Sequence, residues 1–296
     1  MITHRVTQQS ISSRALTGLQ GNLTQLSKLQ EQLSSGKQIT RPSDSPSATA
    51  SVMQLRAETR ANQQYSRNAD NGLGWLTTVY DALNSGVGQA RHARDLTLQG
   101  MSAGTGGSPQ ARAAIAAEID SIRESLINVA NARFGDRPVF GGTTSGGQAY
   151  DTAGVYLGGP EEVLRTVGRD VRVRVDTNGP TAFGSGATQV FAVLADVSQA
   201  MRDDPASLAP ALDRLDAALQ TLQTQVSDVG ARYNRLAQMR QTAEDRILTL
   251  RTQLSEVEDV DMAETIMRLK VQETAYQAAL GATARAVQPS LMDFLR

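Results

Sequence analysis

A heptad stripe in the C-terminal half constrains this chain more than any other feature. Its members are Leu208, Leu212, Leu215, Leu219, Leu222, Val226, Val229, Tyr233, Leu236, Arg240, Ala243, Ile247, Leu250, Leu254 and Val257, and only Arg240 interrupts the apolar pattern. This period is typical of a helix that packs lengthwise against another helix. A helix of this length measures about 75 Å. A compact globule of this chain length would be only about 50 Å across, so the stripe predicts an elongated, mainly α rod of several helices.

Four shorter stripes share this period. The first contains Leu16, Leu19, Leu23, Leu26 and Leu33. Two more, in the first half of the chain, contain Ala69, Leu73, Leu76, Tyr80, Leu83, Val87 and Ala90, and then Ile115, Ile119, Ile122, Leu126 and Val129. The last contains Ile266, Leu269, Tyr276 and Leu280 within residues 261–287. We therefore predict coiled-coil helices at the two chain ends, in 1–45 and 258–296.

Residues that stop or start helices separate these stripes. Gly36 is placed to follow the last turn of the first helix, and Pro42 prevents the helix from continuing. Ser45 followed by Pro46 fits the cap and first position of the next helix. The segment 100–109 divides the second and third helices. The heptad phase slips at 258–261, where Asp261 is placed to cap a new helix.

The segment 135–187 has a different composition from the helical stretches. Residues 135–186 contain 12 of the 25 glycines. Val171 to Val175 alternates apolar and charged residues and precedes Asp176-Thr177-Asn178-Gly179, a turn signal. We predict a small β-rich insert here, between two parts of a rod domain at 46–134 and 188–257; the alternative is a disordered Gly-rich loop. Because the stripes lie outside it, removal of about 138–186 is expected to leave assembly largely intact.

Composition excludes several classes of protein. The 29 Lys and Arg against 30 Asp and Glu give a net charge of −1, which argues against a nucleic-acid-binding protein. The chain has no cysteine and only His4 and His92, so thiolate and multi-histidine metal sites are not expected. No apolar run is long enough to span a membrane, and the first 30 residues show no secretory signal peptide. We predict no cofactor, no metal and no membrane insertion.

Motifs that suggest catalysis have simpler explanations. Gly100 to Gly104 matches the nucleophile elbow G-x-S-x-G, but a helical stripe precedes it and both histidines come before Ser102. Ser34 and Lys37 match S-x-x-K without the partner motifs of that family. A pair of aspartates, Asp259 and Asp261, fits helix capping better than a metal or acid–base site. We therefore predict that the chain is not an enzyme.

The two chain ends resemble the flagellin superfamily. The N-terminal resemblance lies in Leu33-Ser34-Ser35-Gly36-Lys37-Gln38-Ile39-Thr40-Arg41-Pro42-Ser43-Asp44-Ser45-Pro46. The C-terminal resemblance lies in Val260-Asp261-Met262-Ala263-Glu264, Gln277-Ala278-Ala279-Leu280 and Ser290-Leu291-Met292-Asp293-Phe294-Leu295. The two prolines after the Ser-Ser-Gly motif and the segment 131–142 look like the hook–filament junction proteins of that superfamily. Ser45 is a departure, since many relatives have a second Asp there.

The resemblance implies an adaptor that joins hook to filament in the bacterial flagellum, outside the cell. It also implies export through the flagellar type III channel without a cleaved signal peptide. The implied partners are copies of itself in a ring or short tier, another hook-associated protein on the hook side, flagellin on the filament side, and an export chaperone. The implied assembly interface comprises Leu16, Leu19, Leu23, Leu26, Leu33, Ile266, Leu269, Tyr276, Leu280, Leu291 and Phe294. Two alternatives remain: a filament-forming flagellin and an unrelated coiled-coil scaffold.

Overall fold

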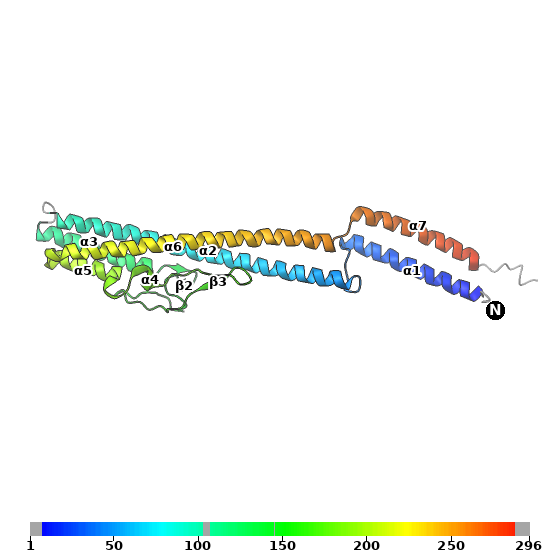
Figure 1. The fold of residues 1–296 in the computed structure, drawn as a ribbon, viewed down its shortest axis with the longest axis horizontal. Coiled ribbons are helices and arrows are strands. Elements are labelled where there is room, and N and C mark those ends of the chain that lie inside the picture. The colour runs from blue at the N-terminus through cyan, green and yellow to red at the C-terminus, as the bar shows by residue number, and fades with distance from the viewer. Residues whose placement is uncertain (1–7, 103–106, 145, 288–296) are drawn as a thin grey trace, which may run out of the picture. The chain divides into compact units, whose positions relative to one another are not determined.

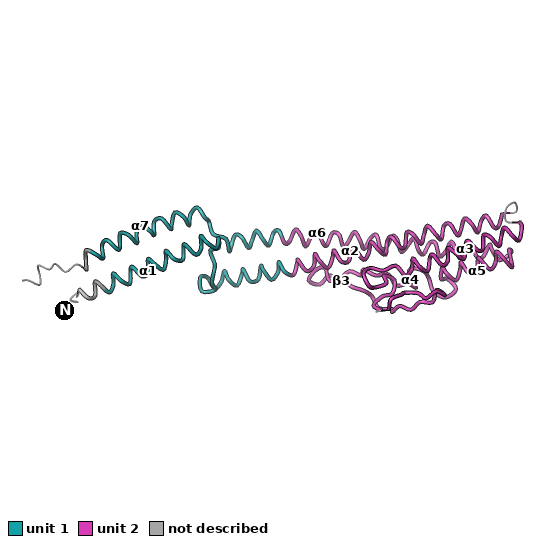
Figure 2. Tube along the Cα trace, turned by 180° about the vertical axis from the view of Figure 1, so that it is seen from behind, with its two compact units in different colours: residues 1–60, 248–296 teal, residues 61–247 magenta. Residues whose placement is uncertain are grey.

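The chain forms two compact units in the computed structural model, which describes residues 8–102, 107–144 and 146–287. Unit 1 comprises residues 1–60 and 248–296, and unit 2 comprises residues 61–247 (Figure 2). The longer helices of the described residues are α1 (Gln8–Ser35), α2 (Pro46–Met101), α3 (Pro109–Ala130), α5 (Val190–Asp203), α6 (Leu208–Glu258) and α7 (Met262–Val287) (Figure 1). The protein is thus mainly α, as predicted. The finer division into five parts stays a prediction.

The predicted helix boundaries are confirmed. Gly36 follows the last residue of α1 with a φ of 70°, a left-handed conformation that glycine adopts without strain. Helix α2 begins at Pro46, and the Ser45 hydroxyl accepts a hydrogen bond from the N–H of Ala48 at 3.4 Å. The carboxylate of Asp261 likewise accepts from the N–H of Glu264 at 3.0 Å, which caps α7.

The long C-terminal stripe lies on one continuous helix, α6. Most of its residues within unit 2 are buried, but Tyr233 keeps 40% of its surface exposed. Arg240, which interrupts the stripe, donates a hydrogen bond to Asp70 of α2 at 3.3 Å. Arg94 of α2 and Asp216 of α6 form a second ion pair between these helices at 2.5 Å. Arg240 can therefore occupy a position of the apolar stripe because its side chain pairs with a carboxylate of α2.

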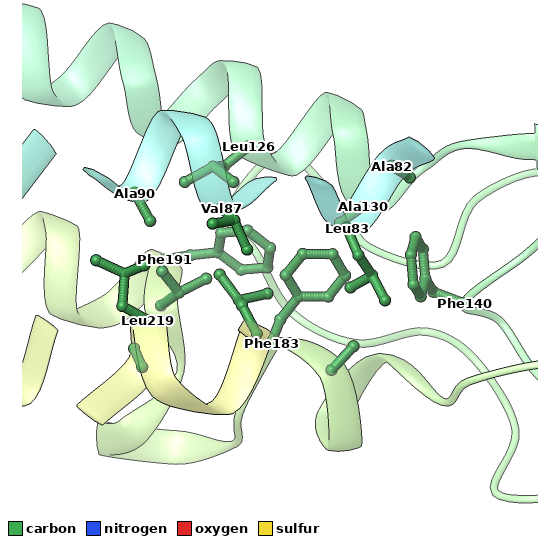
Figure 3. Packing of buried hydrophobic residues seen from close by; sticks show 14 of the residues in the cluster. Ala82, Leu83, Val87, Ala90, Leu126, Ala130, Phe140, Phe183, Phe191 and Leu219 are labelled. Atoms are coloured by element: carbon green, nitrogen blue, oxygen red, sulfur yellow. The ribbon is translucent and has the colours of Figure 1, made fainter. Parts of the chain in front are cut away.

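The core of unit 2 is built from small helical residues and a few aromatic rings. Where α2 approaches α3 and α6, Ala82, Ala90 and Ala130 are buried and bring the helices close together (Figure 3). Phe183 packs edge-on against Phe140 with ring centroids 4.9 Å apart, and it stacks on Phe191 at 5.5 Å. An aromatic-poor chain thus concentrates its rings in one place, where each buries a large apolar area.

The insert between α3 and α5 is folded, with little regular structure. Strand β1 (Arg133–Phe134) pairs antiparallel with β2 (Arg137–Pro138), and β3 (Leu164–Thr166) pairs antiparallel with β4 (Arg172–Arg174). The predicted strand at Val171 to Val175 is therefore present. The turn signal at 176–179 leads into the short helix α4 (Gly179–Phe183). One 3-10 turn, η1 (Gly186–Thr188), lies between α4 and α5, and a second, η2 (Pro205–Ser207), lies between α5 and α6.

The insert shares its core with the helices. Val139, Phe140 and Tyr150 are fully buried in the same hydrophobic cluster as residues of α2 and α6. Removal of about 138–186 would therefore expose the helical face that these side chains cover, and its effect on assembly stays a prediction. Within the insert, Arg174 pairs with the buried Asp176 at 3.1 Å.

Two glycines test how tightly the insert is folded. Gly142 and Gly135 both have a left-handed φ, of 62° and 60°. A Cβ at Gly142 would lie 2.5 Å from the carbonyl oxygen of Gly159, whereas a Cβ at Gly135 would meet nothing within 4 Å. We expect Gly135→Ala to lower the free energy of unfolding by about 1–2 kcal/mol, because alanine is strained in the left-handed conformation. Gly142→Ala should lower it by about 1–3 kcal/mol more, because the backbone around the added Cβ must also move. Thermal unfolding of the two variants measures the difference, and equal melting temperatures would contradict the packed insert.

Candidate assembly interface

The candidate interface in unit 1 is built on the pair of terminal helices. Helices α1 and α7, which are far apart in the sequence, pack side by side (Figure 1). Near the middle of the contact, the side-chain amide of Gln272 donates to both the backbone oxygen and the side-chain oxygen of Asn22, at 3.2 and 3.1 Å. This polar contact was not foreseen from the apolar stripes.

The side chains between the two helices follow a heptad pattern. On α1 the half-buried row is Ala15, Leu19, Asn22, Leu26, Leu29 and Leu33. On α7 it is Thr265, which is buried, followed by the half-buried Leu269, Gln272, Tyr276, Ala279 and Thr283. We call these two rows the terminal seam. Of the predicted interface residues, Leu19, Leu26, Leu33, Leu269 and Tyr276 belong to it.

The remaining predicted residues lie beside the terminal seam. Leu16 and Leu23 are 54% and 51% exposed, one position after Ala15 and Asn22. Ile266 and Leu280 are 48% and 45% exposed, again one position after seam residues. The predicted N-terminal stripe therefore combined two faces of α1, because a small and a polar residue, Ala15 and Asn22, occupy seam positions where leucines were expected.

Further apolar side chains of unit 1 are also uncovered. Met262, Met267 and Val271 of α7 are 47%, 64% and 69% exposed. Together with Leu16, Leu23, Ile266 and Leu280 they are the exposed apolar side chains that we call the uncovered flank of the helix pair, although on α7 they occupy more than one face. Leu291 and Phe294, predicted at the same interface, lie outside the described residues. Scattered exposed apolar residues are normal, but seven large ones on one pair of helices indicate an interaction surface.

A buried carboxylate fastens the base of the helix pair. Glu258, at the end of α6, is 3% exposed, and a single oxygen, Oε1, accepts from Lys37 and from Arg56, the latter at 2.5 Å. Two backbone hydrogen bonds support these ion pairs: the N–H of Gln38 donates to the Glu258 carbonyl at 2.7 Å, and the N–H of Val260 donates to the Gly36 carbonyl at 3.0 Å. We call the ion pairs and these hydrogen bonds together the clasp. The clasp joins the loop after α1, the start of α2 and the end of α6.

Sequence reasoning missed Glu258. The stripe on α6 ends at Val257, and the next residue was treated only as part of a phase slip. Its buried position depends on the tertiary approach of Lys37 and Arg56, which lie some two hundred residues away along the chain. The one usable signal was Lys37 itself, since the chain contains very few lysines.

The loop between α1 and α2 is held by Asp44. Its carboxylate pairs with Lys28 of α1 at 3.0 Å and accepts from the N–H groups of Arg41 and Thr40 at 3.0 and 3.2 Å. The hydrogen bond from Lys28, followed by the one from Arg41, lowers the pKa of Asp44 from 3.8 to about 2. The folded loop therefore favours the ionised form of this side chain.

The catalytic motifs weighed from the sequence have no supporting geometry. Ser102 directly follows the end of α2, a helix and not the strand that a nucleophile elbow requires. His92 is exposed and contacts Glu118 at 3.0 Å, while His4 lies outside the described residues. Within the residues that the structure describes, no three His, Asp or Glu side chains are grouped as metal ligands, and no helix is long and apolar enough to cross a membrane.

The two helical regions whose ends pair in the terminal seam both match a known protein family. The N-terminal helical region of bacterial flagellin matches residues 6–144, and the C-terminal helical region of bacterial flagellin matches residues 212–295. Together they cover well over half of the chain and all of the elements that form the terminal seam. The chain belongs to the bacterial flagellin family.

Relatives within the family have two kinds of names. Flagellar hook-associated protein 3 of Escherichia coli is 26% identical over 308 aligned positions that cover 93% of this chain and 94% of that protein. A flagellin of Halalkalibacterium halodurans is 26% identical, with 90% of each covered. Among solved structures, a flagellar hook-associated protein of Vibrio parahaemolyticus aligns with a TM-score of 0.66, at 21% identity, over 73% of this chain and 100% of that chain. The fold is therefore shared with hook-associated proteins.

The clasp leads to a first test in this unit. We expect Glu258→Gln to leave Lys37 and Arg56 without a charged partner. Removing one partner of a buried ion pair lowers the free energy of unfolding by about 3–5 kcal/mol. Because the two cations here are about half exposed, we expect a smaller loss of about 1–3 kcal/mol. Hydrogen exchange of residues 36–60 should accelerate in the variant. The control, Glu264→Gln, removes an exposed pair with Arg268 and should change exchange little; equal effects of both changes would contradict a special role for Glu258.

The pKa of Asp44 gives a second test. Because the folded pKa lies below the ordinary value, its stabilising effect is complete above pH 4 and is lost as the pH falls toward 2. A carboxyl titration by NMR, assigned with Asp44→Asn, should show a midpoint near 2. Lys28→Gln removes the largest cause of the shift and should move the midpoint up toward 3.8. A midpoint that does not respond to this change would exclude Lys28 as the cause.

Proposed function

We propose that this protein is a structural component of the bacterial flagellum that joins the hook to the filament. The observation that carries the proposal is the uncovered flank of the terminal helix pair. Leu16 and Leu23 on α1, with Ile266 and Leu280 on α7, are about half exposed in the single chain. Full burial of an exposed leucine or isoleucine contributes about 1.5–3 kcal/mol, so each of these half-exposed side chains gains about half of that when a neighbouring copy covers it.

Two facts support a junction role over a filament role. Flagellar hook-associated protein 3 of Escherichia coli and that of Salmonella typhimurium both align over 93% of this chain and 94% of their own length. The solved structures with the same fold include hook-associated proteins of Vibrio parahaemolyticus and Legionella pneumophila, with TM-scores of 0.66 and 0.63. The filament-forming flagellin remains the second candidate, because flagellins align at similar identity.

The junction role defines the partners. Copies of the chain assemble with each other through the uncovered flank, a second hook-associated protein lies on the hook side, and flagellin lies on the filament side. Before assembly, the same apolar surface of α7 suits an export chaperone that receives a helix in a groove. The protein acts outside the cell, in the flagellum, as a structural component.

Deletion of the gene tests the function directly. We expect cells that carry intact hooks, lack filaments and release flagellin into the medium, because flagellin would have no junction to add to. Complementation with the chain should restore attached filaments. Filaments that remain attached in the deletion strain would overturn the junction role. Purified chain that polymerises alone into long tubes would favour the flagellin alternative.

A substitution on α7 tests the uncovered flank. We expect Leu280→Asp to abolish filament attachment, because burying an unpaired carboxylate between subunits is costly. Leu280 is 45% exposed in the single chain, so the melting temperature of the monomer should change little. The control, Leu98→Asp, places the same charge on α2 at a residue that is 41% exposed and lies in unit 2.

Attachment scored by electron microscopy, alongside monomer melting, separates the possible outcomes. Normal attachment with Leu280→Asp would remove α7 from the proposed interface. A large drop in monomer melting temperature would show that this side chain stabilises the folded monomer instead of the assembly. Loss of attachment with Leu98→Asp as well would show that the assay responds to any surface charge.

A further inference from the structure

A hollow of ≈ 410 Å³ opens on unit 1 between the loop that follows α1 and the first turns of α2. Its apolar lining comes from Ile39, Pro42, Val52 and Met53. Met53 keeps 66% of its surface exposed, among the highest values for a large apolar side chain in the described residues. Pockets of about 300–1,000 Å³ with apolar walls and a few polar groups are typical of binding sites. The hollow is thus shaped to receive apolar side chains.

The rim of the hollow carries positive charge. Lys37, Arg41 and Arg56 all line it. Lys37 and Arg56 share the single carboxylate of Glu258, and Arg41, whose side chain is 69% exposed, contacts Glu31 only at 3.4 Å. Three cations thus face two carboxylates, and the most exposed cation has the longest contact. An occupant that combines apolar side chains with a carboxylate fits this hollow best.

One segment of this chain outside the described residues has that chemistry. Residues 288–296 include Leu291, Met292, Asp293, Phe294 and Leu295, so that an acidic side chain lies between two apolar pairs. The other terminal segment, residues 1–7, contains Arg5 and no acidic residue. Residues 288–296 also contain Arg296, so it is Asp293 in particular that suits the cationic rim, whereas residues 1–7 offer the rim a cation and no carboxylate.

The segment is too short to reach the hollow of its own chain. Helix α7 begins just after Glu258, which lines the hollow, and its 26 residues rise about 39 Å away from it. The seven residues from Val287 to Phe294 span at most about 25 Å when fully extended. Because α7 runs lengthwise beside α1, away from the loop (Figure 1), Phe294 can enter this hollow only in a second copy of the chain.

We propose that the hollow binds residues 288–296 of a neighbouring copy. Apolar side chains of this segment, Phe294 among them, enter between Ile39 and Met53, and the carboxylate of Asp293 pairs with Arg41. The contact joins different surfaces of two identical chains, and such contacts generate rings or helical arrays. The inference deepens the proposed function and rests on it, because it names one contact by which copies assemble.

A peptide of residues 286–296 with a fluorescent label tests the proposal by anisotropy with the full-length chain, at a chain concentration where the protein is monomeric. We expect saturable binding that Met53→Glu weakens at least tenfold. The matched control, Met101→Glu, alters a methionine at the end of α2 that is 42% exposed and lies in unit 2, and this variant should bind the peptide as the unaltered chain does. A labelled peptide of residues 1–9 should not bind.

Charge exchange tests the pairing itself. Arg41→Asp in the chain and Asp293→Arg in the peptide should each weaken binding, and together they should restore it. Absent binding, equal binding to the Met53→Glu chain, equal binding of the N-terminal peptide, or no restoration by the exchange would each overturn the proposal. The assay contains no hook or filament, so its failure leaves the junction role standing. Attached filaments in the deletion strain would overturn that role without altering the peptide result.

Discussion

Every long helix of this protein depends on another helix to cover its apolar stripe. In unit 2 that requirement is met within the chain, because α2 and α6 pack together with α3, α5 and the insert around one hydrophobic cluster. In unit 1 it is met only in part, because α1 and α7 cover the terminal seam and leave a flank exposed. A helix draws most of its stability from packing of this kind, so the terminal pair has the most to gain from a neighbour.

The helices and their boundaries could be predicted because their signals are local. A heptad period, a glycine after α1, a proline at the start of α2 and an aspartate before α7 each act within a few residues. The faces of α1 could not be assigned, because leucines at Leu16 and Leu23 sit beside the smaller Ala15 and the polar Asn22, which occupy the seam. Only the partner helix decides which of two adjacent positions is covered.

Contacts between distant residues account for most of what the sequence did not reveal. The clasp at Glu258 needs Lys37 and Arg56, and the aromatic core needs Phe140, Phe183 and Phe191 to meet from three segments of the chain. The composition of the insert and the alternation at Val171 to Val175 predicted a small β-rich segment, and two short antiparallel strand pairs are present there. These signals did not indicate that the insert supplies aromatic rings to a core shared with the helices.

The hydrogen bonds between Gln272 and Asn22 have a consequence for the geometry of many copies. Two smooth apolar stripes can slide by one heptad at little cost, whereas a polar pair within a seam is satisfied in one alignment only. The amide pair therefore fixes the axial register of α7 against α1. Each copy then presents its exposed apolar side chains at the same height, so that a repeating structure can be built from the chain without an accumulating offset.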